Sequence, residues 1–208
     1  MSAGGDATDH PLERLVFFSD AVFAIAITLL VIEIHVPSPA DAAAQGGYGN
    51  ALYHLVPSFA AFVLSFAVIA RFWMGHHAAF SQCGRFDKRL LWPNTLLLMA
   101  VAFMPFATAF LARNLGNVAP AVFYNATLLV TAIFSARLIS IATAPDMRRD
   151  GADLHEIATY PTRGWAVALA AALSLAVAPF APVFSQVPLA AIPLIRRVLA
   201  RIWHVSPR

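Results

Sequence analysis

Cysteine and charged residues are both scarce in this sequence, and each scarcity excludes a class of protein. The single cysteine, Cys83, excludes an internal disulfide framework and a thiolate metal cluster within one chain. Only 12% of the residues are charged, whereas soluble domains average about 25%. The motifs HExxH, GxSxG and the phosphate-binding P-loop do not occur. The sequence therefore gives no sign of an enzyme and predicts neither a cofactor nor a bound metal.

The residues that remain are mostly apolar. Hydrophobic residues make up 60% of the chain, and the mean hydropathy is +0.70. One soluble core of this size cannot hide so much apolar surface, but a lipid solvent removes the need to hide it. The length accommodates about six membrane spans of roughly 20 residues. We therefore predict an all-α integral membrane protein with a single six-helix transmembrane domain over residues 1–208. The predicted spans cover residues 14–35, 52–76, 91–112, 119–142, 164–184 and 187–203.

The positive charges support this even number of spans. Cytoplasmic loops of membrane proteins are enriched in Lys and Arg. With six spans, only Arg113 of the 14 Lys and Arg residues lies on the side opposite the N-terminus. The N- and C-termini are accordingly predicted to be cytoplasmic. The last span is short and carries Arg196 and Arg197, so an interfacial helix is the alternative there. No basic region precedes the first apolar segment, which favours a retained span over a cleaved signal. Because the basic residues lie in loops, we expect no nucleic-acid partner.

Two acidic residues fall within the first span. An ionisable side chain inside a bilayer is costly and marks a candidate functional site. Asp20 can belong to a buried packing network or can contact an ion directly. Its candidate partners are Arg14, Arg71, His76 and His77. Glu33, near the outer end, can be a solvated helix-end residue or can draw cations towards a pore.

One apolar stripe of the first span has two interpretations. Ile25, Leu29 and Ile32 are spaced i, i+4, i+7 and share a face of a helix, with Thr28 beside them. In a single buried helix this stripe is core. Around a symmetry axis, the same stripe forms hydrophobic rings that constrict a pore and gate it by dewetting. A ring of threonine hydroxyls would then offer oxygens to a partly hydrated cation.

The start of this span carries a recognisable pattern. Residues 14–20 read RLVFFSD, which fits RxxxFSD, and are followed by AVFAIAITLL. This segment resembles the first helix of the transmembrane protein 175 family, in its bacterial branch. Further residues agree with that resemblance: Arg71-Phe72-Trp73, His76-His77 and Asn94.

The resemblance implies a potassium channel without the TVGYG carbonyl filter. It implies a homotetramer in the bacterial inner membrane, surrounded by lipid, in which the first helix of each copy lines the pore and potassium is the permeant ion. Ile25 would form the narrow constriction, Leu29 and Ile32 would continue the apolar lining, and Thr28 would supply a hydroxyl layer linked to selectivity. Preference for potassium over sodium would be moderate.

The resemblance also implies a structural polar network near the cytoplasmic end of the helices. Its predicted members are Arg14, Phe18, Ser19, Asp20, Arg71, Trp73, His77 and Asn94. The alternative functions are a proton-permeable channel, which would use Asp20 and the histidines, and a secondary transporter. The latter is disfavoured because Asp20 and Glu33 lie near the span ends. A membrane scaffold that conducts nothing is a further alternative.

Overall fold

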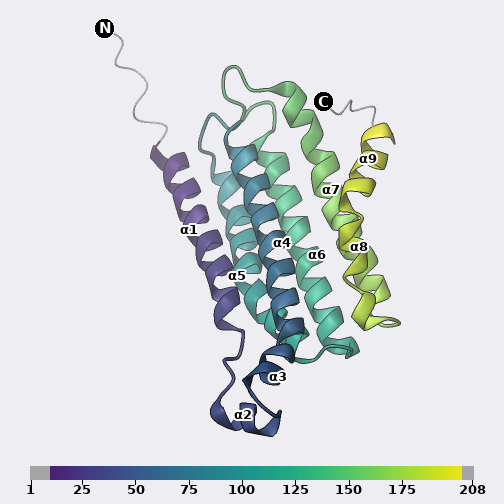
Figure 1. Cartoon of the computed structure of the whole chain (residues 1–208). Coiled ribbons are helices and arrows are strands. Elements are labelled where there is room, and N and C mark those ends of the chain that lie inside the picture. Colours follow the sequence, from purple (N-terminus) through teal and green to yellow (C-terminus); the bar gives the residue numbers. More distant parts are fainter. Residues whose placement is uncertain (1–9, 203–208) are drawn as a thin grey trace.

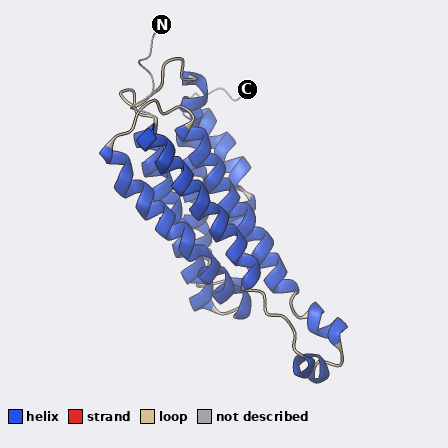
Figure 2. Ribbon diagram, turned by 90° about the vertical axis from the view of Figure 1, so that its left-hand side faces the viewer, coloured by secondary structure: helices blue, strands red, loops and turns tan. Residues whose placement is uncertain are grey.

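The structure is a computed structural model that describes residues 10–202, and within this range the regular elements are helices (Figures 1 and 2). The long helices are α1 (His10–Ile32), α4 (Val56–Phe80), α5 (Leu91–Arg113), α6 (Val118–Ala142) and α7 (Leu154–Val177). The short ones are α2 (Pro39–Ala44), α3 (Tyr48–Tyr53), α8 (Val187–Ala190) and α9 (Ile192–Ile202), with 3-10 turns η1 (Lys88–Leu90) and η2 (Pro182–Phe184).

The long helices form an up-and-down bundle in which α4, α5 and α6 lie at the centre. Helix α1 packs on α4 and α5 at one edge, whereas α7 packs on α6 and α9 at the other (Figure 1). Successive helices alternate in direction, so the α4–α5 and α6–α7 linkers lie at the same end of the bundle as the start of α1 and the end of α9. We call this the linker end. Helices α2 and α3 project beyond the opposite end (Figure 2).

Several helix bounds differ from the predicted spans, and the local sequence explains why. Helix α7 begins at Leu154 because Asp153 caps it, accepting a hydrogen bond from the Glu156 backbone N–H. The prediction started this span ten residues later, at Gly164, directly after the last charged residue of the linker, Arg163. The predicted span 187–203 is broken between α8 and α9, and its two parts, Pro182–Ala190 and Ile192–Ile202, are bent by 49°. Pro193 lacks the N–H that a continuous helix would need there. Residue 203 lies outside the described range.

Not every helix is equally suited to a membrane. Among the described residues, four stretches are long and apolar enough to cross one: His10–Ile32, Tyr48–Phe80, Lys88–Arg113 and Val118–Ala142. The bent pair of α8 and α9 raises this to five if it counts as one span. Helix α7 is long enough, but its first half carries His155, Glu156, Pro161 and Arg163. The all-helical membrane architecture is thus present, and six crossings remain a prediction.

The two linkers at the linker end are paired through their backbones. Gly84 N–H donates to Met147 O at 2.8 Å, and Arg149 N–H donates to Gln82 O at 2.9 Å. A Cβ on Gly84 would lie 2.5 Å from the Arg149 Cα, so only glycine permits this approach. Cys83, between these bonds, is buried, and burial raises the pKa of its thiol.

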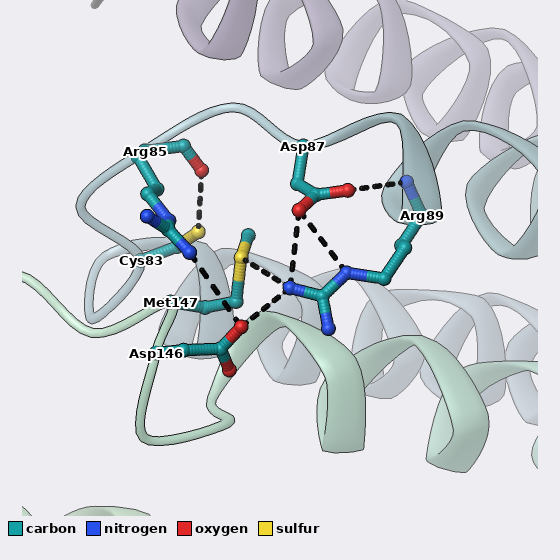
Figure 3. A network of polar contacts seen from close by, with 6 residues as sticks. All are labelled: Cys83, Arg85, Asp87, Arg89, Asp146 and Met147. Carbon is teal, nitrogen blue, oxygen red and sulfur yellow. Dashed lines mark hydrogen bonds and ion pairs between the residues drawn. The ribbon is translucent and has the colours of Figure 1, made fainter.

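Ion pairs tie the same linkers together on their exposed side (Figure 3). The Arg89 guanidinium bridges Asp87 and Asp146, and Arg85 pairs with Asp146 at 3.5 Å. Hydrogen bonds from the Arg89 side chain hold the pKa of both carboxyls below the usual range. The α4–α5 linker is thereby held against the α6–α7 linker by Arg85 and Arg89, which both pair with Asp146.

We expect Gly84→Ala to lower the free energy of unfolding by about 1–3 kcal/mol, because the new methyl group forces the paired linkers apart. Thermal unfolding of the detergent-solubilised protein measures this. Gly49→Ala is the matched control, because a Cβ at Gly49 meets no atom within 4 Å. An unchanged unfolding temperature for Gly84→Ala would contradict the close approach.

We also expect acid to weaken the linker contact. Both carboxyls have lowered pKa values, so their contribution is complete above the unfolded-state value of about 3.9 and is lost as pH falls further. The unfolding temperature should therefore stay level down to about pH 5 and drop at lower pH. Arg89→Gln should flatten this drop, whereas Lys88→Gln, which removes an exposed charge next to it, should leave it unchanged. Equal profiles for the two variants would contradict the role of Arg89.

Candidate functional site

Helix α1 uses one side for packing. Its buried residues are Ser19, Phe23, Ala26 and Leu30. Their spacing of four, three and four residues places them on one stripe of the helix. This stripe faces α4 and α5, the two long helices on which α1 packs. Val16, Val22 and Ile27 flank this stripe and are partly buried, and the far side of α1 is left exposed.

The predicted pore stripe lies on that uncovered side. Ile25, Leu29 and Ile32 are 57%, 39% and 72% exposed. Their helix, α1, lies at the edge of the bundle (Figure 1). Because these three side chains are exposed, they are not core in this chain. An apolar row of this kind is covered either by lipid or by another protein copy.

Thr28 is exposed beside this stripe. Its hydroxyl donates a hydrogen bond to Ile25 O at 2.9 Å, within its own helix. The proton is therefore engaged, and the hydroxyl oxygen keeps lone-pair capacity towards the uncovered side. Chemically, the residue presents an oxygen acceptor next to three apolar side chains.

A buried hydrogen-bond chain holds α1 to α5 and α4 near the linker end. His76 Nε2 lies 3.0 Å from Asn94 Oδ1, and Asn94 Nδ2 donates to Ser19 Oγ at 3.0 Å. The Ser19 hydroxyl donates to Leu15 O at 2.8 Å. Each donor has an acceptor in this order if His76 carries its proton on Nε2. All three side chains are almost completely buried, so the chain fixes the rotation of α1.

His76 is the member that the sequence analysis did not place in the network. His76 was a candidate partner for Asp20, and the predicted network contained His77 in its place. In the structure, the His76 ring stacks on Phe80 at 4.4 Å and lies 5.6 Å from the Phe23 ring. The signal was available in the helical phase, because Ile69, Phe72, His76 and Phe80 follow one stripe of α4.

Asp20 forms a second contact between α1 and α4. Trp73 Nε1 donates to Asp20 Oδ1 at 2.9 Å, and the Trp73 ring lies 5.7 Å from the ring of His77. This pair lies nearer the surface than the Ser19–Asn94–His76 chain. Asp20 thus has a neutral hydrogen-bond donor as its partner in place of the predicted arginine or histidine.

Three predicted members do not join this network. Arg14 and Phe18 are exposed. Phe18 follows Arg14 by four residues and precedes Ile25 by seven, so all three lie on the same exposed stripe of α1. Arg71 is two residues from Trp73, which is about 200° around the helix, and so lies on the opposite side of α4. Within residues 10–202 the structure does not bring these three side chains to Asp20, and their place in one polar network remains a prediction.

Glu33 lies at the other end of α1 and contacts α5. Arg113 Nη2 lies 3.4 Å from Glu33 Oε2 and donates to Glu33 O at 3.2 Å. Arg113 was the basic residue predicted on the side opposite the linkers. The pair ties the end of α1 to the end of α5 and offsets the charge that could attract cations. In residues 10–202 no group of His, Cys, Asp and Glu residues is placed to hold a metal ion.

We expect Asn94→Ala to lower the free energy of unfolding by at least about 1–3 kcal/mol, because the buried His76 N–H loses its acceptor. Thermal unfolding in detergent measures the loss. Thr95→Ala is the control, because the Thr95 hydroxyl is exposed and bonds only to Leu91 O of its own helix. Equal unfolding temperatures for the two variants would contradict the structural role of the chain.

Comparison with known proteins places this geometry in a family. Residues 14–105 match the family described as the endosomal/lysosomal potassium channel TMEM175. A potassium channel of Chamaesiphon minutus is 42% identical over 148 residues, which are 69% of this chain and 72% of that protein. The human endosomal/lysosomal proton channel TMEM175 is 36% identical over 100 residues, which are 46% of this chain and 20% of that protein.

A solved structure agrees over nearly the whole chain. The crystal structure of a lysosomal potassium-selective channel TMEM175 homolog from Chamaesiphon minutus superposes with a TM-score of 0.74 at 31% identity, and the match covers 93% of this chain and 98% of that chain. The matched segment 14–105 contains the uncovered stripe of α1 and the contacts that Ser19 and Asp20 make with α4 and α5. By sequence, by fold and by the content of that segment, the chain belongs to the TMEM175 family of ion channels.

Proposed function

We propose that this chain is the subunit of a potassium channel in which α1 of several copies lines the ion path. The observation that carries the proposal is the uncovered apolar stripe of Ile25, Leu29 and Ile32 on a helix whose opposite side is packed. Potassium as the permeant ion is supported by the Chamaesiphon minutus relatives, which are a potassium channel and a potassium-selective channel homolog.

A single bundle provides no ion path of its own. Its centre is filled by side chains of α5 and α6, among them Leu97, Val101, Met104 and Leu128, which are fully buried. The uncovered stripe, by contrast, lies at the edge of the bundle. A closed ring of copies, which is the common symmetry for such assemblies, brings one stripe from each copy to a shared axis. We propose a homotetramer, as the family resemblance implies.

In such a ring, Ile25, Leu29 and Ile32 form apolar rings and Ile25 forms the narrow one. Apolar rings gate a pore by dewetting and admit an ion only after it sheds part of its water. Sodium holds its water more tightly than potassium, so potassium passes with a moderate preference. Thr28 offers its hydroxyl oxygen to the partly hydrated ion one turn from Ile25.

The contacts of α1 suit this role because they hold both ends of the helix. Near the linker end, Ser19 and Asp20 bond to Asn94 and Trp73. Near the other end, Glu33 pairs with Arg113. Between these points the uncovered stripe carries no polar contact to its own bundle other than the hydroxyl of Thr28 to Ile25 O. The helix is thus fixed in position while its pore side stays apolar.

We propose that six crossings form one transmembrane domain in the bacterial inner membrane, with the linker end in the cytoplasm. The ion pairs of Arg85 and Arg89 lie at this end, which fits the enrichment of basic residues in cytoplasmic loops.

Proton permeation is the second candidate, because the human relative is named a proton channel. The residues available for it are Asp20, His76 and His77. The hydrogen-bond chain from His76 ends on the backbone carbonyl of Leu15, so it does not lead to the Ile25 stripe.

We expect liposomes containing the purified protein to pass potassium faster than sodium, and Ile25→Asn to move the flux ratio of the two ions towards one. The polar side chain would wet the constriction and remove the penalty on hydrated sodium. Fluorescence of a flux-coupled dye measures this under opposed gradients of each cation. Val31→Asn is the matched control, because Val31 is exposed on the same helix but lies about 120° around it from Ile25.

Two outcomes would contradict the proposal. If a folded, tetrameric protein passes neither cation, the non-conducting scaffold remains as the function. Equal effects of Ile25→Asn and Val31→Asn would show that the proposed stripe does not line the path. A proton current that persists without potassium or sodium would identify the second candidate function.

A further inference from the structure

Two arginines from different helices line one small cavity on the side of α4 away from α1, and a third lies within electrostatic range of both. They are Arg71 of α4, Arg163 of α7 and Arg196 of α9. Arg71 lies within electrostatic range of both others, and Arg196 lies within range of Arg163. Each of the three is partly buried. Like charges held together away from bulk water repel one another strongly, so this cluster needs a compensating charge.

The chain itself does not supply that charge within residues 10–202. Its described ion pairs involve other cations: His10, His35, Arg85, Arg89 and Arg113. Arg163 Nε is buried without a hydrogen-bond partner, and the guanidinium instead lies over the Tyr160 ring at 5.6 Å. Buried donors are almost always satisfied in folded proteins. An acceptor from outside this part of the chain is therefore required.

Arg71 lines two adjoining hollows, and Arg163 lines one of them. Arg71 and Arg163 share a small cavity of about 40 Å³ with Ser135 and Tyr160. Arg71 also borders a groove of about 390 Å³ whose walls are otherwise largely apolar. The groove walls come from α4, α6, α7, α8 and α9 and include Leu64, Val68, Leu128, Val167, Leu189 and Ile192.

The groove runs from the arginines towards the middle of the bundle. Val68 and Leu64 precede Arg71 on α4 by three and seven residues, which is about 5 and 10 Å farther from the linker end. Arg71 is nine residues before the end of α4, and Arg163 is nine residues after the start of α7. Both therefore lie about 14 Å from the linker end, within the length of the helices and not in the linkers.

We propose that Arg71, Arg163 and Arg196 bind the phosphate of an anionic phospholipid, one of whose acyl chains lies in the apolar groove. The planar guanidinium groups match phosphate oxygens by paired hydrogen bonds. The buried Nε of Arg163 gains an acceptor, and the headgroup charge offsets the repulsion among the cations. The groove selects a lipid over a soluble anion, because a soluble anion would leave the apolar walls unfilled.

The test is lipid binding by the purified full-length protein in neutral detergent. Native mass spectrometry gives the Kd for phosphatidylglycerol, for phosphatidylcholine and for inorganic phosphate. We expect phosphatidylglycerol to bind more tightly than phosphatidylcholine. Arg163→Gln should raise the Kd for phosphatidylglycerol about tenfold. Arg163→Lys, which keeps the charge, should retain part of the affinity. Arg197→Gln is the matched control, because it removes an equal charge from an exposed position on α9.

Thermal unfolding separates binding from folding. Without lipid, Arg163→Gln should unfold at the same or a higher temperature than the natural chain, because one repulsive charge is gone. With phosphatidylglycerol, the natural chain should gain stability and the variant should gain little. No preference between the two lipids, or equal losses in Arg163→Gln and Arg197→Gln, would overturn the site. Competition by inorganic phosphate at the concentration of the lipid would overturn the lipid as its ligand.

Discussion

The arrangement of this chain depends on polar contacts made where apolar contacts do not discriminate. Lipid tails are as apolar as leucine, so a membrane helix gains little from burying one apolar side in preference to another. For α1, the chain from Ser19 through Asn94 to His76 makes that choice. These groups are satisfied only in one rotation of the helix, and that rotation turns Ile25 away from the bundle. The uncovered stripe is thus a consequence of where the polar groups lie.

Hydropathy predicted the helices well where each begins and ends at a change of polarity. The predicted spans 91–112 and 119–142 differ from α5 and α6 by one residue at most. It failed where a helix extends beyond the apolar segment, or where the helix is broken inside the predicted span. The first ten residues of α7 include His155, Glu156 and Arg163 but are helical because Asp153 caps them. The last predicted span is interrupted before Pro193. A hydropathy scan measures affinity for lipid, whereas caps and prolines decide where hydrogen-bonded turns begin and end.

The sequence predicts which residues of the candidate site share a helix face, but it does not predict whether that face is packed or exposed. The spacing of Ile25, Leu29 and Ile32 places them on one face, yet a stripe of this kind is equally suited to core. Only the position of Asn94 on α5 shows that the opposite face is the packed one. The two-residue spacing also places Arg71 and Trp73 on opposite sides of α4. Their assignment to one network rested on the family pattern and not on helical geometry. His76 shows the converse, since its phase with Ile69, Phe72 and Phe80 indicates burial more directly than any motif.

Helix α4 therefore carries two different chemistries on opposite sides. Towards α1 it presents Trp73 and His76, which are neutral groups matched to acceptors on α1 and α5. Towards α7 and α9 it presents Arg71, which is surrounded by like charge. Within residues 10–202 no hydrogen bond or ion pair of Arg71 joins the two sides, so displacement of α4 as a rigid rod is one route by which an event at the arginines can reach α1. Such a displacement would act first on the Trp73–Asp20 bond, because that bond is nearer the surface than the buried chain through Asn94. The geometry thus makes Asp20 the point at which α4 and the proposed pore helix are most directly connected.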